Sequence, residues 1–149
     1  MKQEDKDLLL EDLCNRLSYG VKCNVGEETP YTLSGIEIDD VNGHLFDFVE
    51  KKNGLNMQVY LSEVKPYLFP MSAMTEEQMK EISKRYNFYN FYGVCIEITN
   101  HSAGYWDDDN SCQLEDYLWL ENWFNKNHFD YRGLIDKGLA LDATTINIY

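Results

Sequence analysis

The spacing of the apolar residues changes at Gly20, and this change limits the fold more than any other feature of the sequence. Before Gly20, apolar residues recur at steps of three and four, which predicts an amphipathic helix over residues 3–18. This stripe consists of Leu9, Leu10, Leu13, Cys14 and Leu17. After Gly20, apolar residues alternate with polar ones, which predicts short strands. A chain with both patterns is expected to have an α+β fold.

Four segments of the first half have strand spacing. They cover residues 21–25, 31–38, 44–50 and 57–61, and the stretches between them contain turn-forming residues. Short strands joined by tight turns predict an antiparallel meander. Because so small a sheet cannot leave one face in water, we expect one of two arrangements. It either curls into a small open barrel of the SH3-like kind or packs beneath the first helix.

The segments that follow are predicted to be mostly helical. Residues 62–70 contain two prolines, which predicts a short helical turn with an extended exit. Thr75 and Gln78 have the spacing of a capping box, and the helix that they open is expected to run to about residue 86. Residues 93–99 are apolar and β-branched, which predicts a strand.

The last part of the chain is predicted to contain an aromatic helix over residues 111–127. Its tail, residues 128–149, is expected to form a loop or short helical turns and then an edge strand over residues 145–149. With 149 residues, the chain has the length of a single domain. We therefore expect one domain, with the helix and β-meander in residues 1–70. A helix, a strand and the aromatic helix follow in residues 71–149.

The charge of the chain restricts its partners. There are 26 Asp and Glu residues against 13 Lys and Arg, giving a formal net charge of −13, which repels a long nucleic acid. No apolar run reaches the roughly 18 residues that a membrane span needs, and the first residues are polar. We therefore expect a cytoplasmic protein without membrane association.

The cysteines and histidines are scattered and contain no C-x-x-C pair, so we expect reduced thiols, no metal and no cofactor. These residues are Cys14, Cys23, Cys95 and Cys112, with His44, His101 and His128. Cysteines in such a setting are usually buried as small hydrophobic residues. Cys14 in particular is expected to pack among the leucines of the first helix.

An acidic, aromatic segment is the first candidate binding surface. Residues 101–122 contain no Lys or Arg, and within them two aromatic residues precede three aspartates. The candidate partner-binding residues are Tyr105, Trp106, Asp107, Asp108 and Asp109. Such a surface would attract a basic host protein. The structural alternative is that the acids stabilise the start of the following helix.

A second candidate lies just after the aromatic helix. His128, Tyr131 and Arg132, with Asp130 beside them, could hold a phosphate group or a small nucleotide. The structural alternative, which we favour, is that Phe129 and Tyr131 belong to the core while Asp130 pairs with Arg132. No nucleophile elbow, phosphate-binding loop or dinucleotide fingerprint occurs in the sequence, so we expect no catalytic residues.

Two segments, LSEVKPYLFPMSAMTEEQ and WFNKNHFDYRGLIDKGLALDAT, resemble small acidic uncharacterised proteins of bacterial phage and prophage regions. The resemblance covers about the first 78 and the last 27 residues and carries no assigned activity. It implies a non-enzymatic accessory protein that binds a host protein, with counter-defence as one role that would fit. The alternatives are a sponge for a small signalling nucleotide, an acidic DNA mimic and, last, an enzyme. The oligomeric state is left open.

Overall fold

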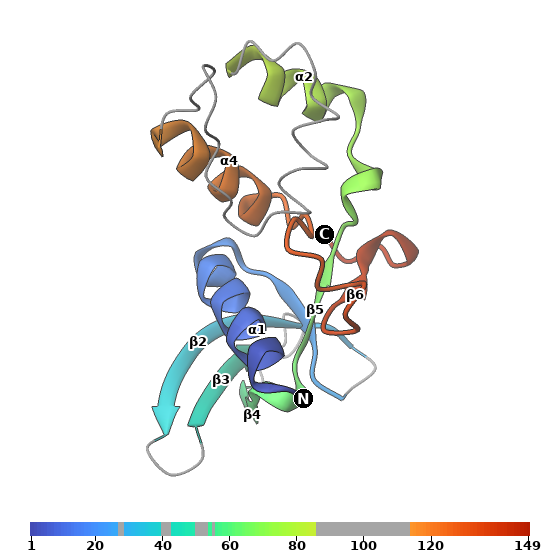
Figure 1. Ribbon diagram of the computed structural model, residues 1–149. Helices are drawn as coiled ribbons and strands as arrows, with labels where there is room; N and C mark the ends of the chain where they lie inside the picture. The colour runs from blue at the N-terminus through green and yellow to red at the C-terminus, as the bar shows by residue number, and fades with distance from the viewer. Residues whose placement is uncertain (27–28, 40–42, 50–53, 55, 86–113) are drawn as a thin grey trace.

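The computed structural model describes residues 1–26, 29–39, 43–49, 54, 56–85 and 114–149. Helix α1 (Gln3–Arg16), a six-stranded sheet and a C-terminal helix α4 (Leu114–Lys126) form its main elements (Figure 1). The predicted α+β fold is therefore confirmed. The strand expected over residues 93–99 and the candidate surface at residues 105–109 lie outside the described residues.

The sheet has the order β4-β3-β2-β1-β5-β6. Its first four strands, β1 (Lys22–Asn24), β2 (Tyr31–Asp39), β3 (Gly43–Val49) and β4 (Asn56–Tyr60), are the predicted antiparallel meander. Strand β5 (Lys65–Leu68) runs antiparallel to β1, and β6 (Leu141–Asp142) runs parallel to β5. The sheet stays open, so of the two arrangements expected for it, packing against the first helix is the one found.

Helix α1 covers the sheet and shares a hydrophobic core with it. Leu9 and Leu13 are fully buried against apolar side chains of the strands, among them Cys23, Phe46 and Phe48. After α1, the 3-10 helix η1 (Leu17–Tyr19) ends at Gly20, whose φ of 65° is the left-handed conformation that glycine commonly adopts at a helix end.

Cys14 is exposed, so the expectation that it packs among the leucines of α1 is wrong. The buried face of α1 is formed by Leu9, Asp12, Leu13 and Arg16. Because Asp12 and Arg16 pair with each other, two charged residues occupy positions on the face that packs inward. This turns Cys14 toward solvent.

The extended exit predicted after residue 62 is the strand β5. It follows the 3-10 helix η2 (Leu61–Glu63), which is the predicted helical turn. Pro66 stands opposite Cys23 of β1, although a proline has no N–H to donate to a neighbouring strand. This is why the sequence pattern alone did not identify β5.

Helix α2 (Glu76–Arg85) follows the 3-10 helix η3 (Met71–Ala73) and begins with the predicted capping box. The N–H of Thr75 donates to Oε1 of Gln78 (2.8 Å), and the N–H of Gln78 donates to Oγ1 of Thr75 (3.3 Å). Helices α2 and α4 share a second, smaller hydrophobic cluster with the chain after α4. Its buried members are Ile82, Leu120, Trp123, Phe124, Phe129 and Tyr131.

The edge strand expected over residues 145–149 is not found, because the last strand is β6 at Leu141–Asp142. The side chain of Asp142 accepts hydrogen bonds from the N–H and the hydroxyl group of Thr144. These bonds start the 3-10 helix η4 (Ala143–Thr145) and turn the chain away from the sheet.

Candidate functional site

A buried ion pair on α1 is the centre of the polar cluster in the described part of the chain. Asp12 and Arg16, both fully buried, are joined by two hydrogen bonds, Nε to Oδ2 (2.8 Å) and Nη2 to Oδ1 (3.0 Å). They lie four residues apart on the helix, so their side chains meet on one face. Burial of a charge is costly unless it is paired, and this geometry supplies the pairing.

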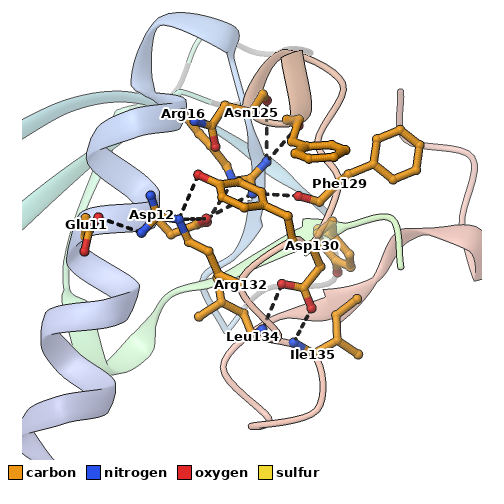
Figure 2. Close-up of polar contacts among 12 residues, drawn as sticks. Glu11, Asp12, Arg16, Asn125, Phe129, Asp130, Arg132, Leu134 and Ile135 are labelled. Atoms are coloured by element: carbon orange, nitrogen blue, oxygen red, sulfur yellow. Dashed lines mark hydrogen bonds and ion pairs between the residues drawn. The ribbon is translucent and has the colours of Figure 1, made fainter. Parts of the chain in front are cut away.

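The guanidinium group of Arg16 also reaches the end of α4 (Figure 2). It donates to the carbonyl oxygens of Phe129 (2.8 Å), Phe124 (3.4 Å) and Asn125 (3.5 Å). The C-terminal end of a helix has unpaired carbonyl groups and a partial negative charge, which a buried guanidinium group stabilises. Arg16 therefore joins the first helix of the chain to the last.

The end of α4 has the hydrogen bonds of a Schellman motif. The N–H of His128 donates to the carbonyl oxygen of Asn125 (3.2 Å), and the N–H of Phe129 donates to that of Phe124 (3.0 Å). His128 has a φ of 57°, in the left-handed region where glycine is the usual residue. The histidine side chain is thus held at a position whose backbone conformation is unfavourable for it.

Arg132 forms a second bridge between the two helices. Its Nη1 lies 2.7 Å from Oε1 of Glu11 on α1, and its Nη2 lies 2.6 Å from Oε1 of Glu121 on α4. Its Nε donates to the hydroxyl group of Tyr131 (2.8 Å), which in turn donates to Glu121 (3.0 Å). All three nitrogens of this guanidinium group therefore have partners within the protein.

Asp130 does not pair with Arg132, so that part of the structural alternative is wrong. Its carboxylate instead accepts hydrogen bonds from the N–H groups of Leu134 and Ile135, both at 2.8 Å (Figure 2). Burial raises the pKa of Asp130, and these two bonds act in the opposite direction. The other part is confirmed, because Phe129 and Tyr131 are buried in the second hydrophobic cluster.

His128 is held as a neutral ring. Burial, followed by the positive charges of Arg16 and Lys22, lowers its pKa from 6.5 to about 4. Its imidazole stacks on the ring of Tyr149, with centroids 4.1 Å apart and an interplanar angle of 17°. Its Nδ1 atom is buried and has no hydrogen-bond partner among the described residues.

The three predicted ligand-binding residues are thus used inside the protein. Tyr131 and Arg132 bind each other and Glu121, while His128 packs against Tyr149. Sequence reasoning missed the two bridges, whose remaining members are Glu11, Asp12, Arg16 and Glu121. The available signal was the spacing of Asp12 and Arg16, which places a complementary pair in phase with Leu9 and Leu13.

Within the described ranges, no group of three or more His, Cys, Asp or Glu side chains is arranged to hold a metal ion. Cys14 and Cys23 are free thiols. No helix among these residues has the length and apolar character needed to cross a membrane. No protein-family model, no curated protein and no solved structure matches the chain.

Proposed function

We propose that this protein is a non-enzymatic accessory protein of the phage and prophage type, which binds a host protein that has a basic surface. One observation supports this proposal above the others. The guanidinium groups of Arg16 and Arg132 are paired with the protein's own carboxylates and carbonyl oxygens, in a chain of formal net charge −13. The protein is therefore better suited to attract a cationic partner than an anionic one.

The acidic side chains exposed on the described helices agree with this negative net charge. Glu4, Asp7 and Glu11 are exposed on α1, and α2 exposes Glu76, Glu77 and Glu81. Charges on the surface act mainly on the rate of association with a partner, and aromatic side chains at an interface act mainly on dissociation. The segment from Tyr105 to Asp109 combines both kinds of residue and is the proposed contact surface.

The nucleotide sponge has less support, because it would use Arg132 as its cation. To grip a phosphate group, Arg132 would have to leave Glu11 and Glu121, which lie 2.7 and 2.6 Å from its nitrogens. An incoming phosphate would also meet the charge of Asp12, 3.7 Å from Nε of Arg132. A nucleotide would therefore have to replace interactions that the fold already makes.

The proposal is tested by replacing Asp107, Asp108 and Asp109 with asparagine. A variant with glutamine at Glu76, Glu77 and Glu81 makes the same charge change on α2 and is the matched control. Immobilised wild-type and variant proteins are used to capture partners from bacterial lysate at several salt concentrations, and the association rate of the captured protein is then measured. We expect the asparagine variant to slow association by roughly tenfold at low salt, clearly more than the control variant does, and to flatten its salt dependence.

Equal effects of the two triple variants would mean that only net charge matters, and would contradict a specific surface. A melting temperature that falls in the asparagine variant would mean that the aspartates cap a helix. In parallel, a thermal-shift screen with a nucleotide library tests the sponge. A saturable stabilisation by one nucleotide that is lost in Arg132→Gln would favour the sponge over protein binding.

A further inference from the structure

The side chain of Tyr149 occupies a well-defined position between strand β5 and the end of α4. Its ring stacks on His128, with centroids 4.1 Å apart, and makes a tilted contact with Phe69 at 5.7 Å. Phe69 follows β5 and is tied to the segment after α4. Its N–H donates to the carbonyl oxygen of His128, and its own carbonyl accepts from Asp130, both at 2.8 Å. The two rings that hold Tyr149 are thus fixed to one rigid backbone unit.

The hydroxyl group of Tyr149 is bound at both of its hydrogen-bonding functions. It accepts from the N–H of Lys22 on β1 (3.0 Å) and donates to the carbonyl oxygen of Tyr67 on β5 (2.9 Å). The register of Cys23 with Pro66 places Lys22 opposite Tyr67. A regular antiparallel ladder would join these two backbone groups directly. The phenol hydroxyl stands between them instead, at the place where β5 passes from β1 to β6.

The contact with Tyr149 also accounts for the histidine at position 128. A left-handed residue at the end of a helix is usually glycine or asparagine, because a larger side chain is strained there. Among the described residues the Nδ1 of His128 has no hydrogen-bond partner. The interaction that its side chain makes is the stacking of its ring on Tyr149. The ring forms one wall of the position that Tyr149 fills. A role of this ring in holding Tyr149 would explain why a histidine is kept at a strained backbone position.

The chain that carries Tyr149 is only lightly attached. Among the described residues, the hydrogen bonds of residues 144–148 stay within residues 142–148. Thr144, Thr145, Ile146 and Asn147 are exposed, and a groove of about 390 Å³ lies between Phe69 and residues 143–149. Tyr149 itself is 43 % exposed although its hydroxyl group is bound. Of the hydrogen bonds made by described residues 144–149, only those of the Tyr149 hydroxyl group therefore reach strands β1 and β5.

We propose that the groups around Tyr149 form a binding site for a phenol, and that Tyr149 of the same chain occupies this site. The N–H of Lys22 and the carbonyl of Tyr67 recognise the hydroxyl group, and the rings of His128 and Phe69 hold the aromatic ring. The ligand class is a para-substituted phenol, which includes the tyrosine side chain of another polypeptide. This site is independent of the acidic segment in the proposed function.

The test removes the occupant and supplies a phenol in solution. Tyr149→Ala is expected to lower the melting temperature by about 5–10 °C, and saturating p-cresol should recover at least half of this loss. Toluene has the same ring without the hydroxyl group, and we expect it to bind at least about tenfold more weakly. N-acetyltyrosine amide is the third ligand. If N-acetyltyrosine amide also raises the melting temperature of Tyr149→Ala, the site accepts tyrosine side chains. If only p-cresol does so, the site is limited to small phenols.

Tyr60→Ala is the matched control, because Tyr60 is 42 % exposed and contacts none of the site residues in the interactions described above. The proposal is overturned if p-cresol shifts Tyr149→Ala no more than Tyr60→Ala, or if toluene and p-cresol act equally. Should Tyr149→Ala fail to fold, refolding from urea with and without p-cresol replaces the melting experiment. Refolding that p-cresol does not improve would then overturn the proposal.

Discussion

Three features make the environment of His128 unfavourable for its side chain. It has a left-handed backbone, a buried Nδ1 atom without a partner among the described residues, and a pKa that burial and two nearby cations lower to about 4. Strain of this kind persists only where the surrounding structure holds it, here through the Schellman motif and the stack on Tyr149. The folded protein therefore favours the neutral form of this ring.

The lowered pKa of His128 makes stability depend on pH. In the unfolded chain the ring takes up a proton near pH 6.5, whereas the folded ring does so only near pH 4, so the unfolded state binds more protons between these values. The stabilisation is complete above pH 6.5 and is lost as the pH falls to 4, by about 3 kcal/mol in all. Urea unfolding from pH 7.5 to 4 measures this loss.

His128→Asn is the control for this prediction, since asparagine tolerates the left-handed backbone and does not titrate. The difference in unfolding free energy between the wild type and this variant should shrink as the pH falls. A difference that stays constant between pH 7 and pH 4 would show that the pKa of His128 is the same in the folded and unfolded states.

Two aromatic residues of α4 are expected to be structural. Trp123 is 6 % exposed and stacks on Phe129 with centroids 5.8 Å apart, and Phe124 is 1 % exposed. Trp123→Ala or Phe124→Ala should therefore lower the unfolding free energy by about 3–5 kcal/mol. Leu118→Ala on the same helix is the control, because Leu118 is exposed. Losses below about 1 kcal/mol at both aromatic positions would mean that they are not part of the core.

Helices α1 and α4 are joined by charged side chains. Arg16→Met would leave the carboxylate of Asp12 buried without its hydrogen-bonded partner. It would also remove the bonds of Arg16 to the carbonyl oxygens of Phe124, Asn125 and Phe129. We expect a loss of about 3–5 kcal/mol in unfolding free energy. Replacing both members, as in Asp12→Leu with Arg16→Met, should cost less than Arg16→Met alone. A double variant at least as unstable as the single one would contradict this account of the pair.

Residue patterns within a short segment predicted those helices and strands whose formation depends on residues close together in the sequence. The apolar period located α1 and the first four strands to within one or two residues at each end, and the spacing of Thr75 and Gln78 located the start of α2. Strands β5 and β6 were missed as strands because their pairing depends on distant residues. Tyr67 lies beside Leu141, and neither position carries an alternating pattern that would show it. Short parallel pairing of this kind has no local signature.

The candidate site was harder to predict than the fold, for a related physical reason. Buried charges such as Arg16 look like surface residues in a sequence until their partners are known. Those partners are carbonyl groups more than a hundred positions later, and backbone groups leave no mark on residue identity. The acidic segment from Tyr105 to Asp109 stays a prediction.

The described residues form two hydrophobic clusters, one under α1 and the sheet and one between α2 and α4. The bridges made by Arg16 and Arg132 connect the helices that belong to them. We therefore expect one cooperative unfolding transition, as for a single domain. In a Trp106→Phe variant, the fluorescence of Trp119 and Trp123 reports on α4, and far-UV circular dichroism reports on the helices and the sheet together. Transitions by the two probes that do not coincide would mean that the clusters unfold separately.

The pairing of Arg16 has a consequence for synthesis of the chain on the ribosome. Asp12 lies one turn away and is made at once, but the carbonyl group of Phe129 is 113 positions later in the sequence. At about 5–20 residues per second, the interval is on the order of ten seconds. During this time Asp12 is the only one of these partners that Arg16 has. We therefore expect the charged end of the inward face of α1 to become fully buried only after Phe129 has been made.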